Sequence, residues 1–336
     1  MRALIFSEVA GGAVRCGVCP HGCIVKDGAT GVCGVRRNDG GVLNALNHGL
    51  LVAMGDDPIE KKPLFHFKPG SHSFSIAAAG CNLRCAHCQN WRISQWPVMN
   101  PGRTIPGDSV AAADVVSAAL ERGCSSISYT YTEPAMFVEY ALEVMALARD
   151  SLLANVFVTN GYISKGCVSR VAPLLDAANV DLKSSSDDFY RHQCGGRVAP
   201  VKDTIAALHA AGVWVEVTTL IIPGLNDSDS DIRDVAGFIA GVSIDIPWHV
   251  SAFHPDFRTT GIPRTPAASV KRAMDAGMEA GLRYIYGGNL AGEVGEDTAC
   301  PSCATTLVHR EGFSVLANRV TNGCCPVCGA AVAGRW

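Results

Sequence analysis

Residues 74–88 read FSIAAAGCNLRCAHC, an apolar run of strand type that ends at three cysteines with the spacing CX3CX2C, Cys81, Cys85 and Cys88. Three thiolates leave one iron of a four-iron cluster without a protein ligand, and such an iron can bind and reduce a substrate. The stretch therefore predicts redox radical chemistry. A structural zinc knuckle and a thioredoxin-like pair at Cys85 and Cys88 are the alternatives. The first needs a fourth ligand nearby, and the second has no need of Cys81.

The rest of the chain is large enough for a barrel-sized core. Its 336 residues, 48% of them hydrophobic, suggest one large domain with accessory segments. The formal charge of −3, with scattered Lys and Arg, argues against nucleic acid as a partner. No apolar run approaches the ~20 residues that span a bilayer, and no export signal is visible, so we expect no membrane association and a cytoplasmic protein.

Helical patterns alternate with short β-rich runs after the three cysteines. Asp108 and Ser109 are expected to cap a helix that ends near Arg122, and residues 96–107 are expected to form a loop. We expect strands at residues 126–131, 155–159, 179–182, 213–218, 248–251 and 283–286. This alternation predicts a parallel sheet, either open or a partial barrel, with its chemistry at the carboxyl ends of the strands.

Two further cysteine groups flank this region. Four cysteines with the spacing CX2CX3CX9C would hold zinc or a second iron–sulfur cluster, and spacing does not choose between them: Cys16, Cys19, Cys23 and Cys33. Two CPxC knuckles have the spacing of a zinc ribbon, or hold iron as rubredoxin does: Cys300, Cys303, Cys325 and Cys328. Metal binding should supply the folding free energy of this tail. Cys324 could replace Cys325, and the isolated Cys124, Cys167 and Cys194 are expected to be buried thiols.

Segments along nearly the whole chain resemble a known family: CGVCPHGC, DPIEKKPLFHF, GCNLRCAHCQNW, SYTYTEP, VTNGY, DLKS, LIIPGLND, PWHVSAFHP and YIYGGN. They are similar to the radical S-adenosylmethionine (SAM) enzymes, and most of all to the AmmeMemoRadiSam system branch, related to pyruvate formate-lyase activating enzymes. The resemblance implies an α/β fold, a partial (β/α)6 TIM-like barrel with small cysteine-rich metal-binding modules at both ends. The implied domains are residues 1–68, 69–292 and 293–336.

The resemblance also implies site residues. Cys81, Cys85 and Cys88 would hold a [4Fe-4S] cluster that binds SAM, and the residues expected to contact SAM or lie near it are His87, Thr132, Glu133, Asn160, Asp181, Lys183, His249 and His254. Each has a structural alternative in the sequence. Glu133 could only cap a helix, Asn160 could only begin a turn before Gly161, and Asp181 with Lys183 could be a weak surface ion pair. A lone histidine is more often structural, and His87 could instead ligate a metal.

The implied activity is reductive cleavage of SAM to methionine and a 5′-deoxyadenosyl radical, which abstracts hydrogen from an unidentified substrate, possibly a protein. A glycyl radical enzyme activating enzyme is one alternative. A non-enzymatic multi-metal scaffold or electron-transfer protein is the other. Expected partners are an electron donor such as flavodoxin or ferredoxin, together with AMMECR1-like and Memo-like proteins.

Overall fold

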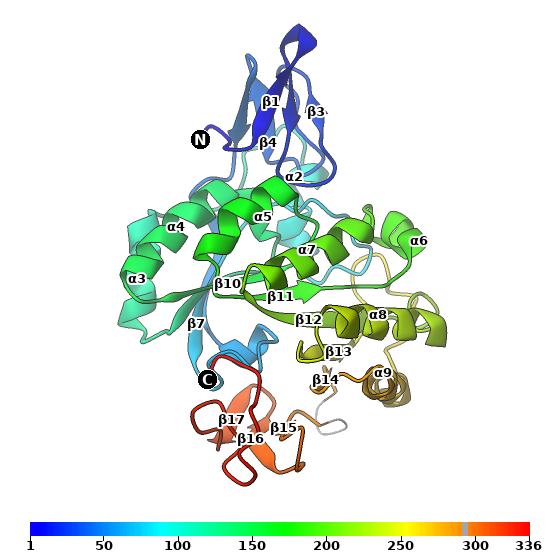
Figure 1. Cartoon of the computed structure of the whole chain (residues 1–336). Coiled ribbons are helices and arrows are strands. Elements are labelled where there is room, and N and C mark those ends of the chain that lie inside the picture. The colour runs from blue at the N-terminus through cyan, green and yellow to red at the C-terminus, as the bar shows by residue number, and fades with distance from the viewer. Residues whose placement is uncertain (291–294) are drawn as a thin grey trace.

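The computed structural model describes residues 1–290 and 295–336, and its centre is one large sheet (Figure 1). In the described residues this sheet has nine strands, in the order β14-β13-β12-β11-β10-β9-β7-β6-β8. Their bounds are β6 (Leu50–Pro58), β7 (His72–Ala78), β8 (Asp108–Ser109), β9 (Ser126–Tyr129), β10 (Ala154–Thr159), β11 (Ala177–Asp181), β12 (Trp214–Ile221), β13 (Trp248–Ala252) and β14 (Ile285–Gly288).

All neighbouring strands from β7 to β14 pair in parallel, whereas β6 runs antiparallel to β7 and β8 antiparallel to β6. The sheet is open, with β14 and β8 at its edges. This confirms the predicted α/β fold with a mostly parallel sheet. Strand β6 lies within the predicted segment 1–68 but belongs to the large sheet.

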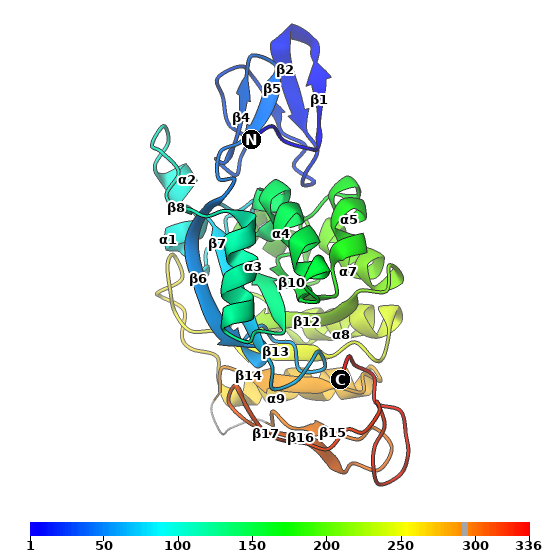
Figure 2. The same cartoon turned by 90° about the vertical axis from the view of Figure 1, so that its left-hand side faces the viewer.

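Helices connect the parallel strands and cover the outer face of the sheet (Figures 1 and 2). In the described residues the α-helices are α1 (Trp91–Ser94), α2 (Trp96–Met99), α3 (Ala112–Glu121), α4 (Val138–Asp150), α5 (Lys165–Val171), α6 (Asp187–Phe189), α7 (Ala199–Ala210), α8 (Asp229–Val242) and α9 (Ala267–Glu279). Their buried residues recur at three- to four-residue spacing, as Ile232, Val235 and Ile239 do in α8. No helix in these residues is both long and apolar enough to cross a bilayer.

Two local expectations need correction. Asp108 and Ser109 form strand β8 instead of capping a helix, because their backbone pairs with Leu50 and Leu51. Helix α3 begins at Ala112 without a side-chain cap. The expected loop at 96–107 also begins with α2, in which Pro97 occupies a first-turn position that suits proline. Strand pairing thus replaced the expected cap in the first case, and a short helix replaced the start of the expected loop in the second.

The N-terminal cysteine module forms a small β-unit on one side of the large sheet (Figure 2). Its three-stranded sheet contains β1 (Phe6–Val9), β2 (Ala13–Cys16) and β3 (Ile24–Val25), followed by the hairpin β4 (Arg36–Asp39) and β5 (Val42–Ala45). The buried Arg36 guanidinium donates to both carboxylate oxygens of Glu139 in α4, at 2.9 and 2.7 Å. This bidentate pair joins the module to the helical layer.

The C-terminal module lies on the opposite side of the molecule (Figure 1). Its sheet contains β15 (Thr298–Ala299), β16 (Thr306–Glu311) and β17 (Ser314–Asn318). Leu307 and Val308 pack in one core with Phe65, Tyr284 and Tyr286. The predicted boundary at residues 292 and 293 lies outside the described residues.

Short helical turns complete the chain. The 3-10 turns are η1 (Ala10–Gly12), η2 (Ile59–Lys61), η3 (Pro134–Phe137) and η4 (Ala172–Leu174), and one π-helical turn is η5 (Tyr190–Cys194). Two of these turns position site residues: η2 ends at Lys61 and is followed by Lys62, both of which line the central cavity, and η5 ends beside the central cysteine loop.

Candidate active site

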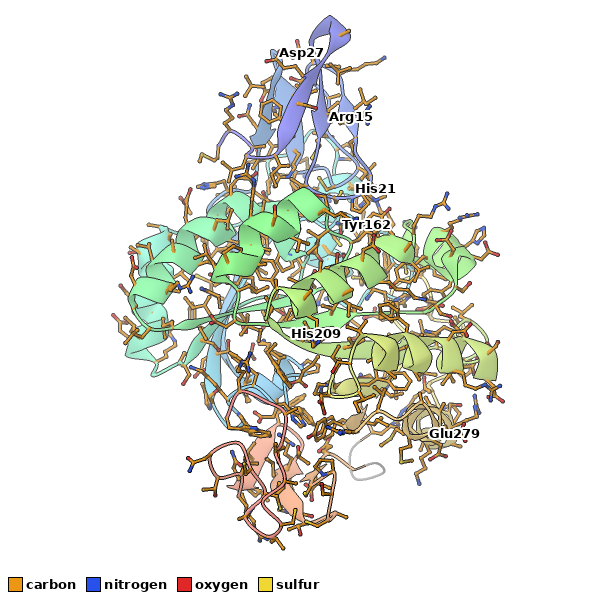
Figure 3. All side chains as sticks on the ribbon, in the orientation of Figure 1. Arg15, His21, Asp27, Tyr162, His209 and Glu279 are labelled. Atoms are coloured by element: carbon orange, nitrogen blue, oxygen red, sulfur yellow. The ribbon has the colours of Figure 1, made fainter. Side chains whose placement is uncertain are left out.

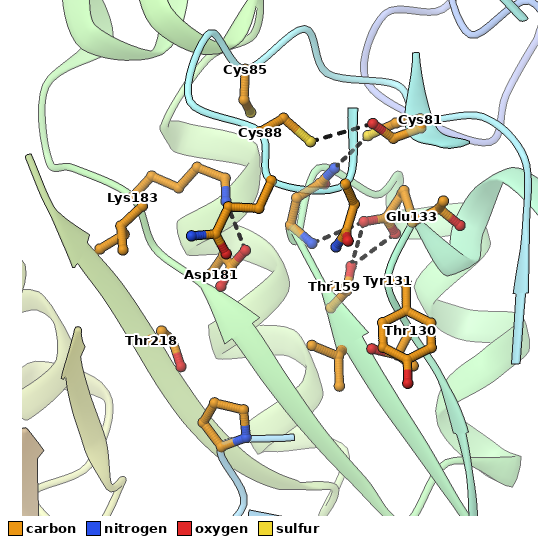
Figure 4. Close-up of a pocket in the computed structure, with 18 of the residues that line it drawn as sticks. Cys81, Cys85, Cys88, Thr130, Tyr131, Glu133, Thr159, Asp181, Lys183 and Thr218 are labelled. Carbon is orange, nitrogen blue, oxygen red and sulfur yellow. Dashed lines mark hydrogen bonds and ion pairs between the residues drawn. The ribbon is translucent and has the colours of Figure 1, made fainter. Parts of the chain in front are cut away.

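A cavity of about 350 Å³ opens at the carboxyl ends of the parallel strands (Figure 4). This volume is in the range of small-molecule sites, ~300–1,000 Å³. Its lining includes most residues predicted from the sequence: Cys81, Cys85, His87, Cys88, Thr132, Glu133, Asn160, Asp181 and Lys183. They meet because parallel strands place their carboxyl ends at one edge of the sheet.

The loop of Cys81, Cys85 and Cys88 follows β7 and is held from two sides. Gly80 has a φ of +114°, and a Cβ there would lie 2.7 Å from the Val35 side chain of the N-terminal module. Glycine is therefore required where the loop leaves the strand. The Arg84 N–H donates to the Cys194 carbonyl at 2.6 Å, and the Ala86 N–H donates to the Gln193 carbonyl at 2.8 Å. These bonds tie the loop to η5.

The N-terminal module also packs on this cysteine loop. An imidazole nitrogen of His21, Nε2, lies 2.8 Å from the Asn82 carbonyl oxygen, and its ring lies 5.0 Å from that of Tyr162 (Figure 3). Arg84 donates from its guanidinium to the Val32 carbonyl. The module thus contacts the loop between the cysteines as well as α4.

The donor set fits an iron–sulfur cluster. Three thiols line one cavity, and in the described residues Cys81, Cys85 and Cys88 do not together form a group whose ligand atoms all lie within 4.8 Å, the spacing of a single-ion site. The Leu83 N–H and the Asn160 amide lie 3.4 and 3.5 Å from Cys81 Sγ, and Ser94 Oγ lies 3.3 Å from Cys88 Sγ. Such donors to sulfur tune the potential of a bound cluster.

Glu133 lies in the cavity wall next to the cysteine loop. Its carboxylate accepts from Thr159 Oγ1 at 2.8 and 3.0 Å and from the Asn160 N–H at 2.8 Å. It also caps η3 by accepting from the Ala135 N–H at 3.2 Å. Burial raises the pKa of Glu133 to about 7, although these hydrogen bonds oppose the shift. The capping role and a position facing a ligand therefore coexist, and a cationic ligand would favour the ionised carboxylate.

Asn160 and Thr132 position the loop as well as lining the cavity. The Asn160 side chain donates to Asn82 Oδ1 at 2.8 Å and accepts from the Tyr162 N–H at 2.8 Å. Thr132 Oγ1 donates to the Ala78 carbonyl at 2.7 Å. The turn at Gly161, with a φ of +68°, is present as the alternative interpretation expected, yet the Asn160 amide still reaches Cys81.

Asp181 and Lys183 form an ion pair of 2.7 Å at the end of β11. The Lys183 side chain is 14% exposed and that of Asp181 is 37% exposed, so the pair is partly buried at the cavity. Burial lowers the pKa of Lys183, but Asp181 and the nearby Cys85 and Cys194 more than offset this and raise it. The result is a firmly held cation beside the cysteine loop.

His87 is buried in the cavity wall, and neither ring nitrogen has a hydrogen-bond partner. Burial lowers its pKa to about 3. The ring tilts against Phe189 at 6.0 Å. A neutral ring in the cavity wall is compatible with the expected contact with an adenine base. Its unbonded nitrogens are equally compatible with metal ligation.

His249 and His254 are not among the residues that line the cavity, and their contact with SAM stays a prediction. His249 is the second residue of β13, near the amino end, and its Nε2 lies 2.6 Å from the buried Glu216 carboxylate. His254 lies past the strand, with Nε2 3.4 Å from the Asn289 carbonyl oxygen. Ser251, closer to the carboxyl end of β13, lines the cavity instead.

Sequence reasoning missed a second polar group in the cavity. Lys61 and Lys62 line it, and their ammonium groups donate to opposite oxygens of Asp57 at 2.7 and 2.6 Å. Tyr131 lines it too and donates from its hydroxyl to Asp57. Burial raises the pKa of Asp57, but these hydrogen bonds outweigh it and hold the pKa well below the usual range. The segment DPIEKKPLFHF carried the only sequence signal.

Cys194 was expected to be an isolated buried thiol. It is buried, but its sulfur lies within 4.8 Å of ligand atoms of Cys85 and His87. The hydrogen bond between the Arg84 N–H and its carbonyl shows how η5 brings it there. Cys85 and Cys194 are 109 residues apart in the sequence, so local spacing does not predict that they lie close together.

The two terminal cysteine groups differ in geometry. In the C-terminal group, Sγ of Cys300 lies 3.6 Å from that of Cys328, and Cys303 lies 3.7 Å from Cys325. All four lie within 4.8 Å of one another, close to the ~3.8 Å expected between sulfurs around a tetrahedral ion with bonds of ~2.3 Å. This group could bind a metal. The four N-terminal cysteines are not such a group in the described residues.

Comparison with known proteins agrees with this site. The family model described as the radical SAM superfamily matches residues 75–239. The uncharacterized protein MJ0808 of Methanocaldococcus jannaschii is 39% identical over 333 residues, 98% of each chain. A pyruvate formate-lyase-activating enzyme of Clostridium pasteurianum is 24% identical over 48% of this chain and 67% of its own.

Among solved structures, a radical SAM methyltransferase from Sphaerobacter thermophilus is similar in fold. It superposes with a TM-score of 0.52 and 16% identity, over 66% of this chain and 67% of that chain. At this identity the similarity concerns the fold alone.

Proposed function

Because the chain belongs to the radical SAM superfamily, we propose that it is an enzyme that reductively cleaves SAM to methionine and a 5′-deoxyadenosyl radical, which abstracts hydrogen from a substrate. The observation that carries the proposal is the meeting of Cys81, Cys85 and Cys88 with Glu133 and the Asp181–Lys183 pair in one cavity. A [4Fe-4S] cluster held by the three thiols would supply the electron and bind the amino and carboxylate groups of SAM.

The protein groups have separate tasks in this proposal. The Glu133 carboxylate, fixed by Thr159 and the Asn160 N–H, accepts a hydrogen bond from the methionine amino group. The Lys183 ammonium, held by Asp181, faces the carboxylate or ribose end. His87 provides a neutral ring for the adenine. The walls of the cavity exclude water from the reacting carbon.

Activation of a glycyl radical enzyme is the second candidate. The specific observation in its favour is similarity to proteins named as activating enzymes, the pyruvate formate-lyase-activating enzyme and an isethionate sulfite-lyase activating enzyme of Nitratidesulfovibrio vulgaris. The substrate would then be a glycine in a protein backbone. Membership of the AmmeMemoRadiSam branch, with AMMECR1-like and Memo-like partners, rests on the sequence segments.

Three finer assignments belong to the same proposal. A flavodoxin or ferredoxin would reduce the cluster. The N-terminal cysteines would hold zinc or an auxiliary cluster, and their contact with the loop through Arg84 and His21 supports a place in electron delivery. A reducing cytoplasm suits so many free thiols, 15 in the chain.

The test is anaerobic reconstitution with iron and sulfide, followed by reductant and SAM, with 5′-deoxyadenosine measured by chromatography. We expect product from the native chain, none from Cys85→Ala, and product from Cys124→Ala, a matched control whose thiol lies outside the cavity lining. Undiminished product from Cys85→Ala would contradict the proposal. Zinc at the central cysteines of oxygen-free protein would do so too, and would favour the scaffold alternative.

A further inference from the structure

The cavity has a second end, away from the cysteine loop, that the roles proposed above leave unassigned. Figure 4 shows Cys81, Cys85 and Cys88 at one end and Thr130 and Thr218 toward the other. We define the cavity floor as Lys61, Lys62, Pro63, Tyr131 and Thr218, all of which line the cavity. Because the cysteine end would hold the cluster and SAM, the floor faces the space left for substrate.

The charge that the floor presents to this space is positive. Lys61 and Lys62 line the cavity, whereas Asp57, which holds both ammonium groups, is not among the lining residues. The two lysines and one carboxylate leave a net charge of 2 − 1 = +1. The other cation in the cavity, Lys183, is paired with Asp181 at 2.7 Å. The Lys62 side chain is buried and that of Lys61 is 45% exposed, so the excess positive charge is partly solvated, and it favours an anionic ligand.

The floor also has spare hydrogen-bond donors. An ammonium carries three N–H donors, and in the described residues each lysine donates only to Asp57. The Lys62 side chain is 2% exposed, so water does not readily serve its other donors. Ser75 and Tyr131 also donate to Asp57, so its carboxylate is saturated and serves to position the lysines.

Tyr131 fixes the orientation of this group. Its backbone has a φ of +60°, unusual for an aromatic residue, and such outliers persist where the surroundings enforce them. The conformation places its ring 4.7 Å from the Lys62 ammonium and its hydroxyl on Asp57. Lys62 is thereby held on two sides, by a ring and a carboxylate.

We propose that the cavity floor is the substrate-recognition subsite and that it takes an oxyanion, a carboxylate or phosphate group of a small substrate, on the ammonium groups of Lys61 and Lys62. Thr218 lines the same end, but its hydroxyl donates to Asn179 Oδ1 at 2.9 Å, so the two lysines are the donors to the anion. This inference rests on the proposed function, because only that function assigns the opposite end to SAM. It narrows the substrate to an acidic compound and disfavours a neutral backbone glycine.

The test is equilibrium binding to the reconstituted protein with SAM and without reductant, by calorimetry at constant ionic strength. The probes are malonate, inorganic phosphate and the neutral malonamide. We expect malonate or phosphate to bind and malonamide not to bind, and the preferred anion identifies the group. Lys61→Gln should weaken binding at least about tenfold, the loss expected for one charged hydrogen bond.

Two further variants complete the design. Lys62→Met should weaken binding further. Because Lys62 is buried, this substitution also leaves Asp57 with one ammonium partner in the core, so the partly exposed Lys61 is the main test position. Lys271→Gln, an exposed lysine on α9, is the matched control and should leave binding unchanged. Equal binding of malonamide, binding of neither anion, or no effect of Lys61→Gln would overturn the inference.

The two proposals fail separately. A preparation that cleaves SAM when reductant is added but binds no anion would overturn only the floor assignment. A preparation that binds malonate or phosphate through Lys61 but forms no 5′-deoxyadenosine would overturn only the radical chemistry.

Discussion

The two terminal cysteine modules contain four predicted ligands each, yet they differ in geometry and in what they touch. The C-terminal sulfurs already lie at single-ion distances. Hydrogen bonds from Thr305 lower the pKa of Cys303. A hydrogen bond with the Ala330 backbone lowers the pKa of Cys328, but the neighbouring Cys303 and Cys300 outweigh this effect and raise that pKa. In the N-terminal module burial raises the pKa of Cys16 and Cys33. The N-terminal module packs on the cysteine loop, whereas the C-terminal module packs against Phe65, Tyr284 and Tyr286. The same number of cysteines in two terminal modules therefore does not imply similar sites.

The largest expected effect concerns the C-terminal metal group. Cys325→Ser should release the metal and leave the tail without ordered structure, because metal binding supplies ~10–16 kcal/mol in comparable small modules. Metal analysis and hydrogen exchange of residues 295–336 measure both. Cys324→Ser is the matched control, since this neighbouring thiol is not part of the group of four. Metal loss from the control instead would identify Cys324 as the ligand.

The attachment of the N-terminal module provides the next largest effect. Arg36→Met leaves the buried Glu139 carboxylate unpaired, which should destabilise the protein by ~3–5 kcal/mol. Chemical denaturation measures the change in the free energy of unfolding. Arg37→Met removes the neighbouring exposed pair with Asp39 and should change it little. Equal effects of the two variants would show that the buried pair does not anchor the module.

The corresponding cation of the C-terminal module should matter less. Arg310 Nε lies 3.7 Å from Glu60, a looser pair than Arg36 with Glu139, and its Nη2 donates to the Phe65 carbonyl at 2.7 Å. Arg310→Met should cost about 1.5–3 kcal/mol, the range for hydrogen bonds to a charged group. Hydrogen exchange should increase in residues 295–336 and stay unchanged in residues 1–45. If Arg310→Met lowered the free energy of unfolding as much as Arg36→Met, the two modules would not differ in how strongly these arginines attach them.

The smallest effect is a difference in pH response. Burial raises the pKa of Glu139, but Arg36 outweighs this effect, so the pKa in the folded protein is lowered. The pair therefore stabilises the protein above the ordinary carboxyl pKa of ~4.3. This stabilisation is lost as pH falls through the lower pKa of the folded protein. Burial raises the pKa of Glu60, so its contribution is present below ~4.3 and is lost as pH rises through the folded value.

Acidification should therefore loosen the N-terminal module before the C-terminal one. Hydrogen exchange of the two modules, compared at about pH 6 and about pH 3.5 on either side of the ordinary carboxyl pKa, measures this. Arg36→Met should abolish the response of the N-terminal module. Loosening of the C-terminal module first would contradict the assignment of the two anchors.

Prediction from the sequence succeeded where residues end a strand. Glu133, Asn160, Asp181 and Lys183 meet at the cysteine loop because each follows a parallel strand, and parallel strands share one carboxyl edge. His249 does not join them, because its strand begins only one residue earlier, which puts the ring at the amino end with Glu216. The motif alone does not show at which end of the strand a residue lies.

The sequence by itself determined the three cysteines of the central loop and the α/β class, because both follow from local residue spacing and periodicity. Only the tertiary structure decided that antiparallel pairing of β6 with β7 brings Lys61 and Lys62 to the cavity, where Asp57 holds them from behind its lining, and that η5 brings Cys194 to Cys85. The physical reason is that charged side chains meet in a buried, low-dielectric region only when distant segments pair. Local sequence pattern does not show which segments pair.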